Sequence, residues 1–294
     1  MDIRTLELIL DTFENDAALE LETNLGRRLN VIDLLSFAEG HTRAYNSEAD
    51  STVVAERLLN FNRRLNAINT RLFDRLREQI RGGHTPPAEL RRALDPYTDY
   101  TPQQKGLAHL GPDTLDALLD NILAFAYSPH INEFPSADMI PYHPTPARAV
   151  LDMIDNADLK SDDVVYDFGS GLGRVVILTH LLGGVKARGV EIDPELDQSA
   201  RECALKLGLT GVEFINADVR DVDCAEGTFF FMYTPFTGES LQAVLDKLQR
   251  EAQRRPIKIC THGPCTAWVA EQPWLESRDT NADSSFKVAI FQSR

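Results

Sequence analysis

The chain has 294 residues, 43% of them hydrophobic and 26% charged, which is the composition of an ordinary globular protein. Its net charge of −15 disfavours a nucleic-acid substrate, because enzymes acting on DNA or RNA usually neutralise phosphates with a basic face. No apolar run approaches the roughly 18–20 residues that span a bilayer, acids interrupt the N-terminal segment, and the four cysteines show no metal-ligand spacing. We therefore expect no membrane segment, no metal and a reduced, cytoplasmic protein.

The first 130 residues are predicted to be all helical. Apolar residues recur there at intervals of three or four, and glycine and proline separate the segments. We expect this N-terminal region, residues 1–130, to act as a lid or substrate-selecting cap for a domain formed by residues 131–294. The predicted helices are 3–22, 28–39, 57–81, 87–94 and 113–127.

The helix predicted at 57–81 is unusually basic. An apolar stripe runs from Leu58 to Ile80, and nine arginines, mostly off this stripe, lie between residues 57 and 92. A solvated charged face is the favoured interpretation, and a protein-binding patch is the alternative. Charge reversal at Arg63, Arg64 and Arg71 separates the two, because only a binding patch would lose affinity for its partner or substrate.

Residues 128–146 form a connector with five prolines and little periodicity. It ends in Thr145-Pro146, which predicts an N-cap hydroxyl followed by proline at the first helical position. The helix that follows is expected over 147–157.

From residue 161 onward the pattern alternates between strands and helices. Such alternation predicts βαβ units and a mostly parallel, Rossmann-like α/β sheet with helices on both faces. Ligands in such folds lie at the carboxyl ends of the strands. The predicted strands are 164–168, 187–192, 212–218, 228–233, 257–262 and 286–293, and the predicted helices are 174–182, 194–208 and 240–253.

Three glycines follow the first predicted strand in the pattern D-x-G-x-G-x-G, from Asp167 to Gly173. A dinucleotide fingerprint would need its third glycine at position 174, which is Arg174, and no GK[ST] follows as in a phosphate-binding P-loop. An acid before the glycines instead suits a ligand with a positive ammonium or sulfonium group. Glu191 ends the second strand 24 residues later, where an acid can accept hydrogen bonds from ribose hydroxyls, and Asp218 ends the third.

Together these motifs resemble the class I S-adenosylmethionine-dependent methyltransferases, over residues 142–294. The resemblance implies a seven-stranded sheet and S-adenosylmethionine as the cofactor. It places the glycine turn (Gly169, Ser170, Gly171 and Gly173) with Asp167 at the methionine part of the cofactor. It also places Glu191 and Ile192 at the ribose, and Asp218 and Val219 at the adenine.

A closer resemblance concerns the segment YHPTPARAVLDMI before the glycine turn, together with TFFFMYTPF after it. These are similar to the disruptor-of-telomeric-silencing type of histone-lysine methyltransferase. In that subgroup a Tyr and a Thr before the domain help to enclose the methionine end of the cofactor, and Tyr142 and Thr145 match them by position. The basic nucleosome-binding tail of the subgroup has no counterpart in this sequence, which argues against a histone substrate.

The methyl acceptor is expected beside the end of the fourth strand. Methyltransferases acting on bases or glutamine often carry Asn/Asp-Pro-Pro-aromatic there, whereas this chain has Tyr233, Thr234, Pro235 and Phe236. The missing amide or acid disfavours methylation of a base. Thr234, Pro235 and Phe236 are the predicted substrate contacts. Tyr233 and His262 are the candidate catalytic groups, although both are also typical structural residues at strand ends.

Three functions remain open from the sequence. The first is a methyltransferase acting on a protein side chain or a small molecule. The second is a weakly active or inactive S-adenosylmethionine-binding protein that engages a partner through its helical region. The third, an RNA methyltransferase, needs a basic path that the acidic composition does not supply.

Overall fold

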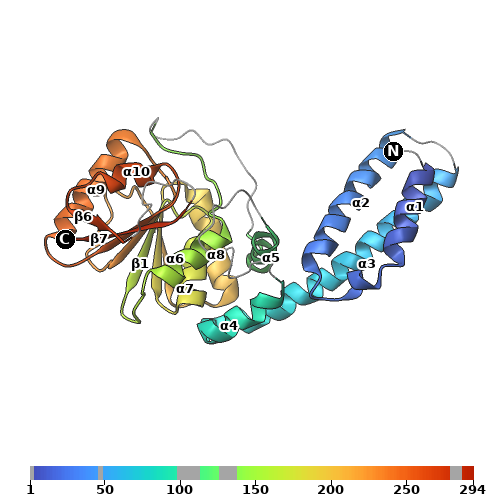
Figure 1. The fold of residues 1–294 in the computed structure, drawn as a ribbon, viewed down its shortest axis with the longest axis horizontal. Coiled ribbons are helices and arrows are strands. Elements are labelled where there is room, and N and C mark those ends of the chain that lie inside the picture. The colour runs from blue at the N-terminus through green and yellow to red at the C-terminus, as the bar shows by residue number, and fades with distance from the viewer. Residues whose placement is uncertain (1–2, 46–48, 98–112, 126–137, 279–286) are drawn as a thin grey trace. The chain divides into compact units, whose positions relative to one another are not determined.

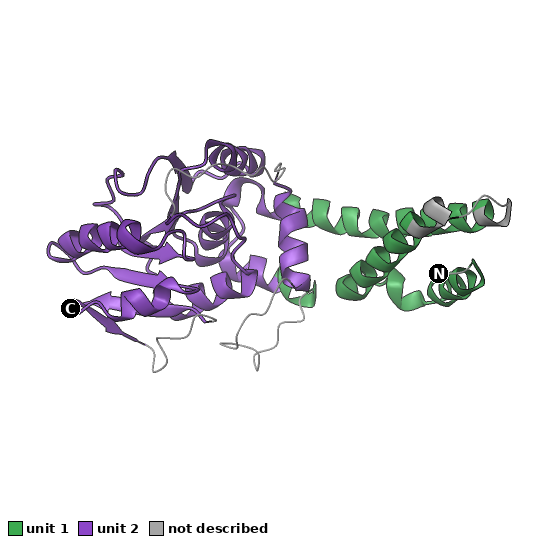
Figure 2. Ribbon diagram, turned by 90° about the horizontal axis from the view of Figure 1, so that it is seen from above, with its two compact units in different colours: residues 1–78, 93–99 green, residues 79–92, 100–294 purple. Residues whose placement is uncertain are grey.

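The structure is a computed structural model that describes residues 3–45, 49–97, 113–125, 138–278 and 287–294. The chain forms two compact units, shown in different colours in Figure 2. Unit 1 consists of residues 1–78 and 93–99, and unit 2 of residues 79–92 and 100–294. The domain boundary predicted at residue 130 lies outside the described residues, and the proposed role of residues 1–130 as a lid or cap stays a prediction.

Unit 1 is helical, as the apolar periodicity predicts. It contains α1 (Ile3–Glu14), η1 (Ala17–Glu20), α2 (Leu25–Tyr45), most of α3 (Ala49–Ile80) and η3 (Asp95–Tyr97). The single helix predicted over 3–22 is wrong, because the Asp16 carboxylate accepts a hydrogen bond from Ala18 N and begins a separate 3-10 turn. The stripes of the three long helices meet in one core that contains Leu6, Leu10, Leu35, Leu58, Phe61 and Leu65.

Several arginines of α3 pair with carboxylates of unit 1. Arg57 lies 2.8 Å from Asp11 and 2.7 Å from Glu14. Arg64 and Arg75 pair with Glu20 and Glu22 at 3.0 and 2.6 Å. These contacts are partly exposed, so each contributes at most about 1 kcal/mol. They support the charged-face interpretation of the helix, and its role as a partner-binding surface stays a prediction.

Arg28 of α2 is fully buried in unit 1 and is held by four acceptors. Its Nε donates to Asn69 Oδ1 of α3 at 2.7 Å. Its two terminal nitrogens donate to the backbone carbonyls of Leu19 (3.3 Å), Leu21 (2.5 Å) and Glu22 (2.9 Å). One side chain therefore fixes the turn after η1 to both long helices, and burial lowers its pKa.

We expect Arg28→Ala to lower the free energy of unfolding of unit 1 by about 3–5 kcal/mol, because it leaves several buried carbonyls without a donor. Urea denaturation monitored by circular dichroism measures the loss. The adjacent Arg27 is the matched control. Its side chain is 59% exposed in its pair with Asp16, so Arg27→Ala should cost less than about 1 kcal/mol. Equal losses for the two variants would contradict a structural role specific to Arg28.

Unit 2 contains a seven-stranded sheet whose order is β3-β2-β1-β4-β5-β7-β6 (Figure 1). The first five strands are parallel, and β7 runs antiparallel to both of its neighbours. This confirms the predicted mostly parallel α/β sheet. The strands are β1 (Val164–Phe168), β2 (Lys186–Glu191), β3 (Val212–Asn216), β4 (Phe229–Met232), β5 (Lys258–Thr261), β6 (Leu275–Ser277) and β7 (Ala289–Ser293).

Helices cover both faces of the sheet, with α6, α7 and α8 on one face and α9 and α10 on the other (Figure 1). The short elements α10 and β6 escaped sequence analysis because neither is long enough to show a period. The helical elements of unit 2 are η2 (Arg81–Gly83), α4 (Pro87–Leu94, which continues into unit 1), α5 (Thr114–Leu123), α6 (Ala147–Asn156), α7 (Arg174–Gly183), α8 (Pro194–Leu207), α9 (Gly238–Ala252) and α10 (Cys265–Ala270).

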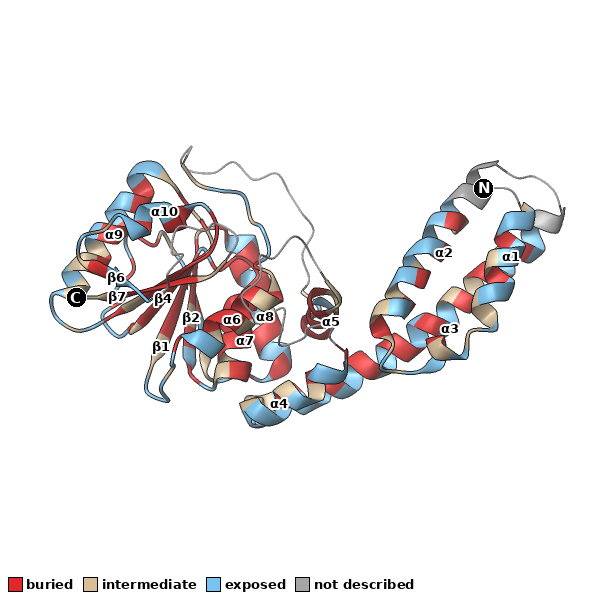
Figure 3. Cartoon of the chain, viewed as in Figure 1, coloured by how far each residue is buried: buried red, intermediate tan, exposed pale blue. Residues whose placement is uncertain are grey.

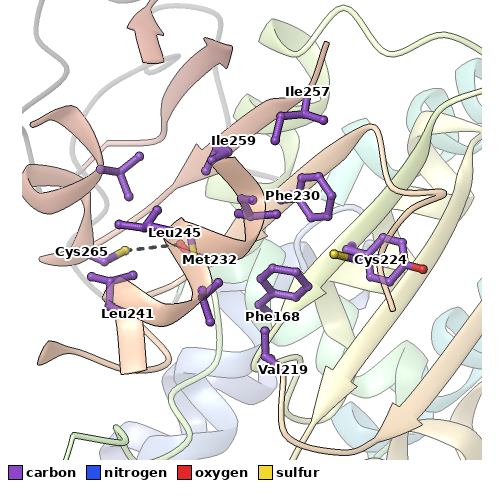
Figure 4. Close-up of a cluster of buried hydrophobic side chains, with 14 of the residues drawn as sticks. Phe168, Val219, Cys224, Phe230, Met232, Leu241, Leu245, Ile257, Ile259 and Cys265 are labelled. Atoms are coloured by element: carbon purple, nitrogen blue, oxygen red, sulfur yellow. Dashed lines mark hydrogen bonds between the residues drawn. The ribbon is translucent and has the colours of Figure 1, made fainter. Parts of the chain in front are cut away.

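The strands of unit 2 are largely buried, whereas the outer faces of the helices are exposed (Figure 3). On the face covered by α9 and α10, Phe168 and Phe230 lie 5.5 Å apart between ring centroids. They pack with Met232, Leu241 and Leu245 in the cluster of Figure 4. Burial on both faces explains why all four residues of β4 are apolar.

The start of α6 differs from its prediction. Pro146, not Thr145, is the N-cap residue, and no side chain of its own segment caps the helix. Asp116 of α5 supplies the missing acceptor instead, because its Oδ1 accepts a hydrogen bond from Ala147 N at 2.8 Å. The predicted N-cap is therefore wrong, since a distant carboxylate takes its place.

No helix within the described ranges is long and apolar enough to cross a membrane. In the same part of the chain, no group of three or more His, Cys, Asp or Glu side chains could hold a metal ion.

Candidate functional site

The ends of β1, β2, β3 and β4 meet at one edge of the sheet. In the parallel register, Phe168 pairs with Val190 on one side and with Met232 on the other, and Glu191 pairs with Asn216. Strand order reverses between β1 and β4, because the chain builds outward from β1 in both directions. This is the point at which α/β sheets bind ligands.

The glycine turn after β1 adopts backbone conformations that other residues avoid. Gly169, Gly171 and Gly173 have φ angles of 75°, 53° and 78°. Val190 O anchors the turn to β2 by accepting hydrogen bonds from Gly169 N and Ser170 N at 2.8 and 3.1 Å. The three glycines thus allow the chain to turn sharply between β1 and α7.

Close neighbours also exclude side chains at the same three positions. A Cβ atom on Gly171 would lie 2.2 Å from the Tyr142 ring, and one on Gly169 would lie 2.3 Å from Pro235. A Cβ on Gly173 would meet Phe214 at 2.5 Å. The turn therefore brings the connector before α6 and the loop after β4 onto one glycine-lined surface.

Glu191 supports the glycine turn from the end of β2. Its Oε2 accepts a hydrogen bond from Gly171 N at 2.7 Å, and its Oε1 accepts one from Asp193 N at 2.9 Å. Burial raises the pKa of this carboxyl, although both hydrogen bonds oppose the rise. Each oxygen retains a second lone pair, so the carboxylate can hold the turn and still accept a hydroxyl donor.

Asp167, the acid before the glycines, is 3% exposed at the end of β1. Burial raises its pKa well above the usual value, and the nearby charge of Glu191 adds to the rise. Two carboxyl groups in one buried environment cannot both ionise cheaply unless a positive charge joins them. The site therefore favours a cationic ligand.

Asp218 follows β3 and is held by Arg220. The arginine Nε lies 3.0 and 3.1 Å from the two carboxylate oxygens, and Nη2 lies 2.6 Å from Oδ2. This pairing lowers the pKa of Asp218. Lys247 of α9 donates to Val219 O at 2.8 Å and to Val222 O, which fixes the loop that carries Asp218.

A cavity of about 810 Å³ collects these groups. Thirteen of the predicted site residues line it, whereas Gly171, Gly173 and His262 do not. The thirteen are Tyr142, Thr145, Asp167, Gly169, Ser170, Glu191, Ile192, Asp218, Val219, Tyr233, Thr234, Pro235 and Phe236.

Thr234 lines the cavity, but its hydroxyl is engaged in the scaffold. Its Oγ1 donates to His262 O at 3.2 Å and accepts from Cys265 N, the first residue of α10, at 3.1 Å. Its φ of 42° is rare for a β-branched residue. These contacts hold the loop after β4 against α10, and contact between Thr234 and a substrate stays a prediction.

The two predicted catalytic groups stack on each other. The rings of Tyr233 and His262 lie 4.8 Å apart with an interplanar angle of 37°. Burial raises the pKa of Tyr233, which keeps its phenol protonated at neutral pH. His262 is 3% exposed. Tyr233 lines the cavity, whereas His262 packs against the Tyr233 ring and does not line it.

Comparison with known proteins finds partial similarity to several methyltransferases. A family model described as histone methylation protein DOT1 matches residues 128–216. A protein-lysine N-methyltransferase from Saccharolobus islandicus is 36% identical over 110 residues, which cover 37% of this chain and 63% of that protein. A ribosomal protein L11 methyltransferase from Edwardsiella ictaluri is 34% identical over 100 residues, covering 34% of this chain and 29% of that protein.

The chain thus spans less than two thirds of the length of these curated relatives. Among solved structures, an RNA methyltransferase from Salinibacter ruber in complex with S-adenosyl-L-homocysteine is 28% identical with a TM-score of 0.41. The match covers 51% of this chain and 92% of that one. The segment matched by the family model contains the glycine turn, which in this chain follows the first strand of a seven-stranded sheet. Part of unit 2 is thus similar to known methyltransferases.

The cofactor of the class I methyltransferases is S-adenosylmethionine, and the cavity of unit 2 fits its groups. Carboxylates of Asp167 and Glu191 suit its cationic and hydroxyl-bearing parts. Two buried atoms of cavity-lining residues, Ser170 Oγ and Arg174 Nε, have no hydrogen-bond partner among the described residues. Because both atoms are buried, the carboxylates are the groups of the cavity that suit the cofactor.

Sequence analysis missed several residues that line this cavity. Arg174 and Arg220 line the cavity, and so does the segment from Met139 to Pro141. Ile140 N donates to Pro235 O at 3.0 Å, and Met139 forms a β-bridge with Phe236. The sequence did not predict this pairing, because the prolines of the connector disfavour a strand. The only available signal was the apolar triplet Met139-Ile140-Pro141, which is too short to interpret.

Proposed function

We propose that this protein binds S-adenosylmethionine and transfers its methyl group to a protein side chain, with lysine as the first acceptor to test. The observation that carries the proposal is a cavity lined by the glycine turn and by acids at the carboxyl ends of β1, β2 and β3. The names of the relatives support a protein acceptor, since they describe a protein-lysine and a ribosomal protein methyltransferase.

In this proposal different residues of the cavity contact different parts of the cofactor. Asp167 and the glycine turn hold the methionine part, Glu191 and Ile192 the ribose, and Asp218 and Val219 the adenine. Tyr142 and Thr145 cover the methionine end. When bound, the cofactor supplies a methyl group that is open to in-line displacement from its sulfonium.

The acceptor side of the cavity is apolar. Pro141, Phe236 and Pro264 line it next to Tyr233. Such walls can contact the aliphatic stem of a lysine, and removing its amine from water favours the neutral form that attacks a methyl group. Alignment of the two reacting groups contributes about 7–11 kcal/mol to the lowering of such barriers. The domain therefore needs no strong acid or base, and Tyr233 and His262 are proposed to orient the acceptor.

Methyl transfer is tested with the full chain, methyl-labelled S-adenosylmethionine and a lysate fractionated into proteins, RNA and small molecules. We expect label in proteins, with methyl-lysine after hydrolysis. Label in RNA would instead favour an RNA methyltransferase and would overturn the proposed protein acceptor. Cofactor binding without incorporation into any fraction would favour the binding protein that acts through its helical region.

The pH dependence of binding is expected to report on Asp167. Its pKa is raised in the ligand-free protein, so it holds a proton to higher pH than usual. S-adenosylmethionine carries one more positive charge than its demethylated product and should favour the ionised carboxylate, which lowers the pKa. Binding of the methyl donor should therefore release more protons, and its affinity relative to the product should rise with pH.

Calorimetry in two buffers of different ionisation enthalpy measures the released protons. In Asp167→Asn the ratio of the two affinities should no longer change with pH. A ratio that is constant with pH in the unaltered protein would rule out this contact between Asp167 and the cationic part of the cofactor.

We propose the cytoplasm as the location, because all four cysteines are buried thiols. Unit 1 is proposed to select the substrate, with the 57–81 segment as its partner-binding face. The acidic composition disfavours nucleic acid as the partner.

A further inference from the structure

Arg174, the first residue of α7, is buried beside the glycine turn. Its side chain is 6% exposed and meets two carboxylates of α5. Nη1 donates to Asp116 Oδ1 at 2.7 Å and to Thr145 O at 3.0 Å, and Nη2 donates to Asp120. A cation at a helix N-terminus is disfavoured by the helix dipole, and burying it costs more. The contacts with α5 and Thr145 O compensate for both effects.

Asp116 joins three helices at this point. Its Oδ1 accepts hydrogen bonds from Arg174 and from Ala147 N, which begins α6. Its Oδ2 accepts from Asp113 N at 3.2 Å in the capping box that begins α5. The side chain is 4% exposed, yet Asp116 is not among the residues that line the cavity. Any effect of Asp116 on a ligand must therefore pass through its neighbours.

Two of those neighbours, Arg174 and Ala147, hold the end of residues 138–146, which we call the strap. At its first end Asp138 Oδ2 accepts from Ser240 N at 2.9 Å, and Ile140 N donates to Pro235 O at 3.0 Å. At its second end Thr145 O and the following Ala147 N are held by Arg174 and Asp116. Between the ends, the Tyr142 ring lies against Gly171. The strap is thus fixed on both sides of the residue that covers the glycine turn.

We propose that Asp116 is a positioning residue for cofactor binding. By holding Arg174 and the start of α6, it sets Thr145 and Tyr142 against the glycine turn. A helix outside the seven-stranded fold then determines how well the cavity binds its ligand. This inference rests on the proposed function, because it concerns the affinity for S-adenosylmethionine or its demethylated product.

The chain offers a graded set of variants. Asp116→Ala removes the acceptor for both Arg174 and Ala147 N, whereas Asp116→Asn keeps an amide oxygen for one of them and loses the charge. Asp120→Asn is the matched control. Asp120 also pairs with Arg174, but its side chain is 50% exposed, and Ala147 N donates to Asp116 instead. The variant therefore removes one charge beside Arg174 and leaves the start of α6 intact.

Calorimetry with S-adenosylhomocysteine on the full chain, well below the melting temperature of each variant, measures the effect. We expect about a tenfold or larger loss of affinity in Asp116→Ala, a smaller loss in Asp116→Asn and little change in Asp120→Asn. A helix-packing role alone would lower the melting temperature and leave the affinity unchanged, and that result would overturn the inference.

Amide hydrogen exchange of the ligand-free chain gives a second readout that does not depend on the cofactor. Besides the start of α5, where the capping box is lost, faster exchange in Asp116→Ala should appear at Ala147 and in the strap and should spare β4 and β5. Unaltered exchange in the strap would also overturn the inference. If the unaltered protein binds no S-adenosylhomocysteine, the proposed function fails, and exchange alone then decides whether Asp116 positions the strap.

Discussion

Glu191→Ala is expected to weaken binding of S-adenosylmethionine by about 100-fold or more, equivalent to about 2.7 kcal/mol. Two effects add in this variant. The carboxylate that faces the cavity is lost, and the amides of Gly171 and Asp193 lose their acceptor. A buried donor left without a partner costs about 1–3 kcal/mol. The glycine turn should therefore lose its conformation together with its ligand.

Isothermal calorimetry measures the affinity of the variant, and Glu195→Ala is its control. Glu195 lies on the exposed first turn of α8, four residues from Glu191, and does not line the cavity. The control should bind as the unaltered protein does. Retained affinity in Glu191→Ala would remove this carboxylate from the binding site and would count against the whole assignment of the cavity.

The parts of the site that the sequence predicted share one property. Asp167, Glu191 and Asp218 lie at or just beyond the carboxyl ends of three parallel strands, so their order along the chain brings them to the same edge. The glycine turn is local as well, because it joins a strand directly to the next helix. Sequence periodicity and motif spacing predict such features well, because each βαβ unit joins two parallel strands in the same way.

The parts that were missed depend on contacts between distant segments. Asp116 caps α6 across 31 residues, and Asp138 holds Ser240 across 102. Thr145 had the sequence of an N-cap but lost that role to Asp116, because a carboxylate from another helix reached Ala147 N. No local sequence pattern predicts which distant carboxylate will accept the hydrogen bond from the first amide of α6.

Gly171→Ala is expected to disable the site without unfolding unit 2. A Cβ at this position would lie 2.2 Å from the Tyr142 ring, and the φ of 53° disfavours alanine as well. The backbone strain costs about 1–2 kcal/mol. The clash adds to it and can be relieved only if Tyr142 and the strap move. We therefore expect a moderate fall in melting temperature and a loss of cofactor affinity of at least about tenfold.

Gly208→Ala separates the clash from the strain. Gly208 ends α8 with a φ of 65°, similar to that of Gly171, but a Cβ there would lie 3.5 Å from its nearest neighbour, Gly82 N. This variant should lose about 1–2 kcal/mol of stability and keep its cofactor affinity. Because both variants carry the same backbone penalty, the difference in affinity isolates the contact between Tyr142 and the glycine turn. Equal affinities in the two variants would show that Tyr142 has no part in covering the cofactor.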